Sequence, residues 1–271
     1  MRPQYTQLSY ATQVAHSPRT MENRGNIVIT GAAGAIGRAA ARVLSADGYR
    51  LLLVDRNEED LTRMAADYPT SVQFVADATN AAQVAEVFRQ ASAGSLDGVI
   101  LAAGIEGPVG NFEDCDDEAF ATVMLVNVKS VWLGIKYGLQ VMKPQRSGSI
   151  VALSSISGVM AAPMLAPYAA SKHAVVGLVR TAAREAAAFN VRVNALCPAP
   201  VDSDMMRRID TDLSEKFPQR LGGGADAAKL VPMQRYATPD EVARAAAFLC
   251  SDASSYCTGS TFMVDGGISC R

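Results

Sequence analysis

A tyrosine and a lysine, Tyr168 and Lys172, form an i, i+4 pair in the alanine-rich segment YAASKH, residues 168–173. On a helix this spacing places both side chains on one face. A lysine ammonium about 4–5 Å from a phenol favours the phenolate by roughly 3–4 kcal/mol at an effective dielectric constant near 20. This gain predicts that the pKa of Tyr168 falls from about 10 towards 7–8, which suits an acid–base catalyst. The alternative is that Tyr168 and Lys172 are two polar residues on an ordinary helix. The rest of the sequence must distinguish this alternative from a catalytic pair.

A glycine-rich turn, TGAAGAIG at residues 30–37, lies between a short β-branched run and a helical pattern. Glycines allow close approach of a pyrophosphate, and a helix N-terminus offers N–H groups and the positive end of its dipole. Asp55 ends the next predicted strand, at the spacing expected for a residue that binds ribose hydroxyls. A plain strand–helix turn with a surface aspartate is the less favoured alternative. The predicted cofactor contacts in this turn are Gly31, Gly34, Ala35, Ile36 and Gly37.

Strands and helices that position these residues alternate along the chain. This order predicts an α/β fold, a single-domain Rossmann-type doubly wound parallel sheet with helices on both faces. A long irregular stretch at about 202–238, with GGG at 222–224, predicts a lid over the site. Strands are expected at 26–30, 49–55, 71–77, 96–104, 148–155, 191–198 and 261–267, and helices at 36–48, 57–68, 80–92, 117–143 and 168–189.

Composition limits the partners and the domain count. Hydrophobic residues make up 49% and charged residues 19%, which is enough apolar material for a large core, and the formal net charge is −2. No basic stripe suggests nucleic acid, and no apolar run approaches the ~18 residues of a membrane span. Without a dividing linker, residues 26–271 are expected to form one catalytic domain. Residues 1–25 lack apolar periodicity and are expected to form a flexible N-terminal arm.

Cysteine and histidine usage bears on compartment and metal binding. The five cysteines are scattered without a C-x-x-C motif, and no secretory apolar segment is present, so we expect free thiols and a cytoplasmic protein. With only two histidines, His16 and His173, a His-rich metal site is excluded, and no metal is predicted. His173, beside Lys172, is interpreted as structural or interfacial. The acidic segment EDCDDE at 113–118 is interpreted as a helix start rather than a cation site.

Taken together, these segments resemble the short-chain dehydrogenase/reductase family over about residues 25–267. The resemblance rests on TGAAGAIG (30–37), AD at 76–77, NV at 127–128, SSISG at 154–158, YAASK at 168–172, RVNALCPAPVDSDM at 192–205 and VDGG at 264–267. Three positions depart from the family pattern. Ala35 replaces the middle glycine, which gives a G-x-x-G-x-x-G spacing closer to the extended sugar-nucleotide branch. Ala102 and Ala199 stand where the family has asparagine and glycine.

The resemblance implies a role for each catalytic residue. Tyr168 exchanges a proton with the substrate oxygen, and Ser155 hydrogen-bonds that oxygen, with the neighbouring Ser154 as the alternative. Asn127 holds a water that links Lys172 to solvent, and Lys172 also binds the nicotinamide ribose. Further cofactor contacts are implied near the adenine, after the fourth strand and after the sixth strand: Asp77, Ala78, Ala103, Gly104, Pro198, Val201 and Ser203.

The implied activity is NAD-dependent interconversion of a secondary alcohol and a ketone by a homotetramer. A non-catalytic dinucleotide-sensing or scaffold protein, and an epimerase or dehydratase of the extended branch, are the alternatives. Arg56, beside Asp55, could pair with the 2′-phosphate of NADP. Arg207 and Arg208 could bind a carboxylate or phosphate tail, although solvated arginines are favoured. The predicted substrate contacts are Ser155, Ser157, Tyr168 and Met205, and the partly apolar pocket is completed by Ile105, Glu106, Met160, Met164 and Met206.

Overall fold

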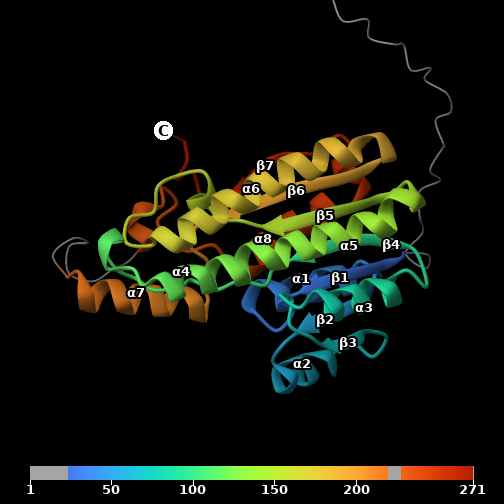
Figure 1. Ribbon diagram of the computed structural model, residues 1–271, viewed down its shortest axis with the longest axis horizontal. Helices are drawn as coiled ribbons and strands as arrows, with labels where there is room; N and C mark the ends of the chain where they lie inside the picture. The colour runs from blue at the N-terminus through green and yellow to red at the C-terminus, as the bar shows by residue number, and fades with distance from the viewer. Residues whose placement is uncertain (1–23, 219–226, 271) are drawn as a thin grey trace, which may run out of the picture.

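Seven parallel strands form one sheet in the order β3-β2-β1-β4-β5-β6-β7 (Figure 1). The structure is a computed structural model that describes residues 24–218 and 227–270. β1 and β6 match their predicted bounds. β4, β5 and β7 are shorter because their last predicted residues leave the sheet as loops, β2 begins one residue later than predicted, and β3 is shorter at both ends. The strands are β1 Asn26–Thr30, β2 Arg50–Asp55, β3 Val72–Val75, β4 Leu96–Leu101, β5 Gly148–Leu153, β6 Val191–Pro198 and β7 Thr261–Val264.

The strand order reverses between β1 and β4, which are neighbours in the sheet although β2 and β3 separate them in sequence. From β1 the chain builds outward to β3 on one side and from β4 to β7 on the other. Ligands of open α/β sheets bind at such a switch point, beyond the carboxyl ends of the strands. The doubly wound fold predicted from the sequence is therefore confirmed, and it places the glycine-rich turn beside the segment that follows β4.

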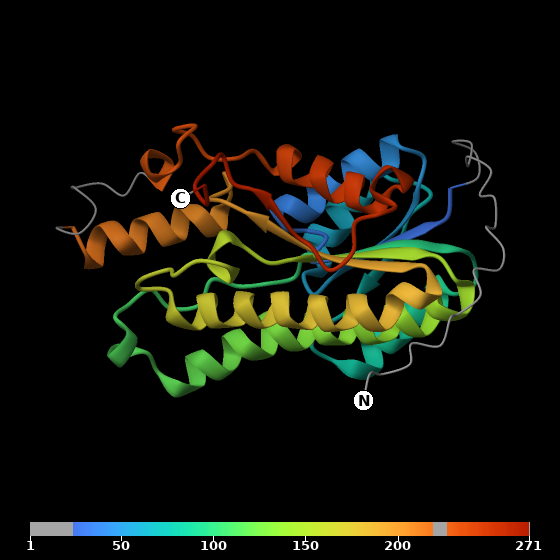
Figure 2. The same ribbon diagram turned by 90° about the horizontal axis from the view of Figure 1, so that it is seen from above.

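Helices cover both faces of the sheet (Figure 2). The core on one face contains residues of α3, α5 and α6, and the core on the other contains residues of α1, α2 and α8. Ile27, Val28 and Ile29 of β1 are fully buried between these two helix layers. A strand that is buried on both faces needs apolar residues at successive positions, which explains the continuous apolar run in β1. The helices are α1 Ala35–Ala46, α2 Glu58–Ala65, α3 Ala81–Ala91, α4 Asp117–Met124, α5 Ser130–Gln145, α6 Ala166–Ala186, α7 Asp204–Lys216 and α8 Pro239–Cys250.

The helix predicted at 117–143 is interrupted by one π-helical segment, Leu125–Lys129, between α4 and α5. Asp116 caps α4 by accepting a hydrogen bond from the Ala119 N–H at 2.9 Å, which confirms the acidic segment as a helix start. The whole run Asp117–Gln145 is long and apolar enough to cross a membrane by length and composition alone, contrary to our expectation. Its buried face, including Leu133 and Met142, packs on the core and accounts for part of this apolar character.

The stretch 202–238 is more regular than predicted. Residues Asp204–Lys216 form α7, capped by Ser203, and Ala227–Leu230 form a 3₁₀ turn. Met205, Ile209 and Leu213 recur at helical spacing and belong to one small apolar cluster. The GGG at 222–224, His16 and nearly all of the predicted arm at 1–25 lie outside the described residues.

Candidate active site

The carboxyl end of β5 and the start of α6 bring the predicted serine and tyrosine together. Ser155 lies just after β5, where its Oγ accepts a hydrogen bond from the Ser157 N–H at 3.1 Å. Its side chain also lies beside Tyr168, near the start of α6, and lowers the pKa of that tyrosine. The neighbouring Ser154 is buried and donates instead to the Lys172 carbonyl at 2.9 Å. The geometry therefore favours Ser155 over the alternative, Ser154, as the serine beside Tyr168.

Lys172 lies one turn along α6 from Tyr168, as the spacing predicts. Its Nζ is 5.4 Å from the centroid of the Tyr168 ring and donates to the Leu153 carbonyl at 2.9 Å. The side chain is only 5% exposed, and burial lowers the pKa of Lys172 to about 8. A titratable amine is thus held close to the phenol by the end of β5 and the first turns of α6.

The prediction that the pKa of Tyr168 falls is wrong when only the groups of the protein itself act on the tyrosine. Burial of the hydroxyl raises the pKa of Tyr168 to about 12, and the neighbouring Ser155, which lowers it, has the smaller effect. The negative charge of Glu106 raises it further. Our sequence estimate counted the lysine charge and omitted desolvation, which disfavours the phenolate. Tyr168 is therefore protonated at neutral pH and is suited first to donating a proton.

Asn127 lies in the π-helical segment, fully buried beside the loop that follows β4. Its Oδ1 accepts from the Ile105 N–H at 2.8 Å, while its Nδ2 donates to the Ile105 carbonyl at 2.9 Å and to Ser171 Oγ at 3.0 Å. π-Helical turns often occur at functional sites. Asn127 thus joins the loop after β4 to α6, and a Cβ on Gly104 would lie 3.2 Å from its Oδ1 and 3.6 Å from Lys172 Nζ. Sequence patterns gave no sign of Ser171 in this network.

The glycine-rich turn has the features that a dinucleotide requires. Gly31 has a φ of +66°, and a Cβ there would lie 2.6 Å from the Ala103 backbone nitrogen. A Cβ on Gly37 would lie 2.2 Å from the Gly31 carbonyl oxygen, so only glycine permits this close approach of α1. The N-cap of α1, Gly34, has no side chain, which leaves the first N–H groups of Ala35, Ile36 and Gly37 without a side-chain cap. This arrangement fits a pyrophosphate.

Asp55 lies at the end of β2 beside this turn. Its Oδ2 accepts from the Ala33 N–H at 2.9 Å, and its Oδ1 accepts from the Asn57 N–H at 3.0 Å. Both bonds fix the carboxylate at the edge of the site, where ribose hydroxyls are expected. Arg56 is exposed.

The other predicted cofactor residues follow the strand ends as expected. Asp77 and Ala78 follow β3, and the Asp77 carboxylate accepts from Thr79. Ser203 caps α7, accepting from the Met206 N–H at 3.2 Å, a structural role that the family resemblance does not specify. Val201 forms an isolated bridge with Ala237, which joins the two ends of the 202–238 stretch. Ala103 and Gly104 follow β4, and Pro198 ends β6.

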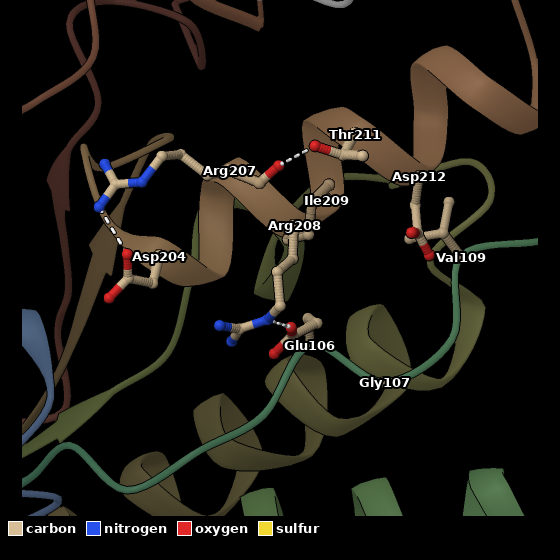
Figure 3. A pocket seen from close by; sticks show the side chains of 9 residues that line it. All are labelled: Glu106, Gly107, Val109, Asp204, Arg207, Arg208, Ile209, Thr211 and Asp212. Atoms are coloured by element: carbon tan, nitrogen blue, oxygen red, sulfur yellow. Dashed lines mark hydrogen bonds and ion pairs between the residues drawn. The ribbon is translucent and has the colours of Figure 1, made fainter.

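The region predicted to bind the substrate is bordered by α7 and the loops after β4 and β5. Met164, Met205 and Met206 pack together with Val109, Ile209 and Leu213. Beside them lies a pocket of about 470 Å³ between α7 and the loop after β4 (Figure 3). Glu106 belongs to this loop and forms an ion pair with Arg208, a partnership that sequence spacing does not reveal. His173 is exposed on α6 with its Nδ1 2.9 Å from the Ala169 carbonyl.

This combination of a doubly wound sheet, an uncapped glycine-rich helix start and a Ser–Tyr–Lys–Asn cluster at the strand ends defines a Rossmann-type oxidoreductase site. A family model described as enoyl-(acyl carrier protein) reductase matches residues 31–269. The chain belongs to the short-chain dehydrogenase/reductase family.

Curated relatives match along nearly their whole length. 2-(S)-Hydroxypropyl-CoM dehydrogenase 3 of Xanthobacter autotrophicus is 36% identical, over 89% of this chain and 95% of the relative. Levodione reductase of Leifsonia aquatica is 34% identical, over 93% and 96%. Cis-4-hydroxycyclohexanecarboxylate dehydrogenase of Sinomonas cyclohexanicum is 36% identical, over 89% and 94%.

Solved structures agree with the fold. NAD⁺-bound xylitol dehydrogenase superposes with a TM-score of 0.84 at 30% identity, over 91% of this chain and 99% of that one. ElxO with NADP bound gives a TM-score of 0.83 at 26% identity, over 92% and 100%. The family thus binds a nicotinamide dinucleotide, and both forms occur among similar structures.

Proposed function

We propose that this protein is an NAD(H)-dependent oxidoreductase that interconverts a secondary alcohol and a ketone, with Tyr168 as acid and base. The observation that carries this proposal is the cluster of Ser155, Tyr168 and Lys172 at the end of β5 and the start of α6, in which Lys172 Nζ is 5.4 Å from the centroid of the tyrosine ring. The relatives, which are named as dehydrogenases and reductases of alcohols and ketones, support it. The test is a screen of purified protein with NAD⁺ or NADH against secondary alcohols and ketones. Absence of turnover across cyclic, aryl and acyclic compounds would contradict it.

Each residue has a defined task in this reaction. A bound nicotinamide dinucleotide supplies or accepts the hydride. In ketone reduction, the Tyr168 hydroxyl donates its proton to the substrate oxygen, while Ser155 hydrogen-bonds the same oxygen and orients it. Lys172 keeps a cation beside the phenolate that remains. In alcohol oxidation the same groups act in reverse, and Tyr168 must first lose its proton. Asn127 positions the loop after β4 next to Lys172.

The alternative functions have less support. A scaffold protein has no need of a buried lysine amine, whose desolvation is unfavourable, next to a phenol. An extended-branch epimerase or dehydratase shares the G-x-x-G-x-x-G spacing, but it carries a larger substrate domain. The described residues form one sheet, and the short relatives are matched over 94–96% of their length.

NAD(H) is the proposed cofactor because the Asp55 carboxylate is fixed where the adenosine ribose is expected and would repel a 2′-phosphate. We expect kcat/KM to favour NADH over NADPH by at least about tenfold, the effect of roughly 1.4 kcal/mol of repulsion. Asp55→Asn should remove most of this preference, whereas Asp77→Asn, at the predicted adenine contact, should affect both dinucleotides alike. Steady-state kinetics with both cofactors measure this. A wild-type preference for NADPH would contradict the proposed cofactor and indicate that pairing of Arg56 with the 2′-phosphate outweighs the repulsion by Asp55.

A homotetramer is the proposed assembly. In support, α5 and α6 form a largely apolar groove of about 720 Å³ that includes Trp132, Leu139 and Leu178. Trp132 is 52% exposed, and a Cβ on Gly177 would meet no atom within 4 Å, so a second copy could pack closely here. We expect light scattering at micromolar concentration to give a tetramer and Trp132→Glu to give smaller species. Val75→Glu, an exposed apolar position on β3, is the control. A monomeric wild-type protein would contradict the assembly.

A further inference from the structure

Two consecutive arginines on α7 differ in their partners. Arg207 binds two carboxylates, with Nη1 2.7 Å from Asp202 Oδ1 and Nη2 2.6 Å from Asp204 Oδ1. Arg208 binds one, with Nε 2.5 Å from Glu106 Oε1. Among the residues that the structure describes, no hydrogen-bond partner is found for the two terminal nitrogens of Arg208. Arg207 is thus satisfied by its own helix end, whereas Arg208 keeps most of its donors available.

The two side chains also point in different directions. Arg207 lies along α7 towards Asp204, whereas Arg208 extends from α7 to the loop after β4 and turns its terminal nitrogens away from Glu106 (Figure 3). Glu106 is only 16% exposed, while Arg208 is 60% exposed. A mostly buried carboxylate therefore holds the Nε edge of an accessible guanidinium. This arrangement orients Arg208 in advance, and a bound anion would not have to restrict a freely moving side chain.

Arg208 is linked to the proposed reaction centre through Glu106, which directly follows Ile105, the residue whose backbone hydrogen-bonds to Asn127. Its partner Glu106 is near enough to Tyr168 for the glutamate charge to contribute to the raised pKa of the tyrosine. The pocket of about 470 Å³ that contains Glu106 and Arg208 also has apolar walls from Val109 and Ile209. Both apolar residues are buried and packed against Met164 and Met205. The pocket therefore offers apolar contacts and an accessible cation side by side.

We propose that Arg208 selects substrates that carry a carboxylate or similar oxyanion at the end remote from the reacting carbon. The terminal nitrogens of its guanidinium would bind the anion in a bidentate manner while Glu106 holds Nε. Asp204 and Asp212 also border the pocket, so a diffuse positive field is not the attraction, and the contact must be local. This inference rests on the proposed alcohol–ketone activity and names its substrate class. One relative, cis-4-hydroxycyclohexanecarboxylate dehydrogenase, has a name that is consistent with such a class.

A matched pair of ketones tests this proposal: 4-oxocyclohexanecarboxylate and its uncharged carboxamide. Wild-type kcat/KM should be higher for the carboxylate. Arg208→Gln should lower kcat/KM for the carboxylate by roughly 10–100-fold, as expected for one or two charge-assisted hydrogen bonds, and change the carboxamide by less than about threefold. Arg207→Gln, the matched control, should leave the carboxylate preference intact. Equal losses for both ketones in Arg208→Gln, a larger loss in Arg207→Gln, or no wild-type preference would each overturn the proposal.

A binding measurement separates this inference from the proposed activity. Cyclohexanecarboxylate and cyclohexanecarboxamide lack a reacting carbonyl group on the ring, and calorimetry in the presence of NADH reports their binding without turnover. Wild-type protein should bind the carboxylate more tightly, and Arg208→Gln should remove the difference. If this selectivity is found but neither ketone is reduced, the activity proposal fails and the anion site stands. If both ketones are reduced equally and neither ring compound binds selectively, the activity stands and the role of Arg208 is refuted.

Discussion

Replacing Tyr168 with phenylalanine is expected to lower kcat for ketone reduction by roughly 10²–10⁴-fold, the usual contribution of a positioned acid–base group. The variant loses only the Tyr168 hydroxyl, which lies beside Ser155. Because the phenyl ring still fills the same space at the start of α6, NADH binding should change by less than about threefold. The rate is followed by the absorbance of NADH and the affinity by calorimetry.

A second tyrosine provides the control for this experiment. Tyr137 on α5 is a half-buried aromatic residue stacked on Phe88, with ring centroids 6.5 Å apart. Tyr137→Phe removes a hydroxyl outside the proposed site and should retain turnover within about twofold. If Tyr168→Phe keeps more than about a tenth of the wild-type kcat, another group carries the proton and the proposed mechanism is wrong.

Replacing Lys172 with methionine should reduce kcat/KM by at least about 10²-fold. The lysine ammonium lies 5.4 Å from the Tyr168 ring centroid. At that separation and an effective dielectric constant near 20, its charge favours the phenolate by roughly 3 kcal/mol. Loss of the predicted contact to the nicotinamide ribose should add to the effect. Steady-state kinetics with the preferred ketone and alcohol measure it, and a loss below about tenfold would contradict the assigned role.

The same variant should be no less stable than the wild type at pH 7, because a buried ammonium destabilises the fold. Burial lowers the pKa of Lys172 from 10.5 to about 8. Between these values the unfolded chain binds the proton that the folded chain has released, so folding stability rises with pH. The penalty is complete below about pH 8 and disappears as the pH approaches 10.5.

Denaturant unfolding at about pH 7 and about pH 9.5 tests this sign. The free energy of unfolding of wild type, relative to Lys172→Met, should increase on the order of 1–3 kcal/mol over this interval. The hydrogen bond to the Leu153 carbonyl, which the variant loses, is independent of this trend. A difference that stays flat or falls with pH would mean that Lys172 is not desolvated as the structure indicates.

The sequence predicts much of the fold because periodicity and turn chemistry act locally. β1 is a short apolar run followed by the glycine turn, and its bounds, Asn26–Thr30, coincide with the prediction. The order of strand-end residues also follows from the alternation, since carboxyl ends of parallel strands share one edge of the sheet. By contrast, α7 lies in the stretch that was predicted as irregular, and the π-helical turn at Leu125–Lys129 has no distinctive sequence pattern.

Sequence patterns do not predict the features of the site that depend on tertiary contacts. The choice between Ser154 and Ser155 is made by where β5 ends, at Leu153, and by which hydroxyl then meets the Lys172 carbonyl. The pKa of Tyr168 is set by burial that spacing along a helix does not report. The Glu106–Arg208 ion pair joins residues that are distant in sequence and meet only when α7 packs beside the loop after β4.

Deuterium tracing tests the central claim, hydride exchange at a carbinol carbon with Tyr168 as the proton carrier, most directly. Purified protein is incubated with NAD⁺ and a secondary alcohol carrying deuterium on its carbinol carbon, and the NADH formed is analysed by mass spectrometry. The proposed mechanism predicts one deuterium in each NADH produced by the wild type and almost no NADH from Tyr168→Phe. NADH without deuterium, or equal amounts of labelled NADH from both proteins, would contradict it.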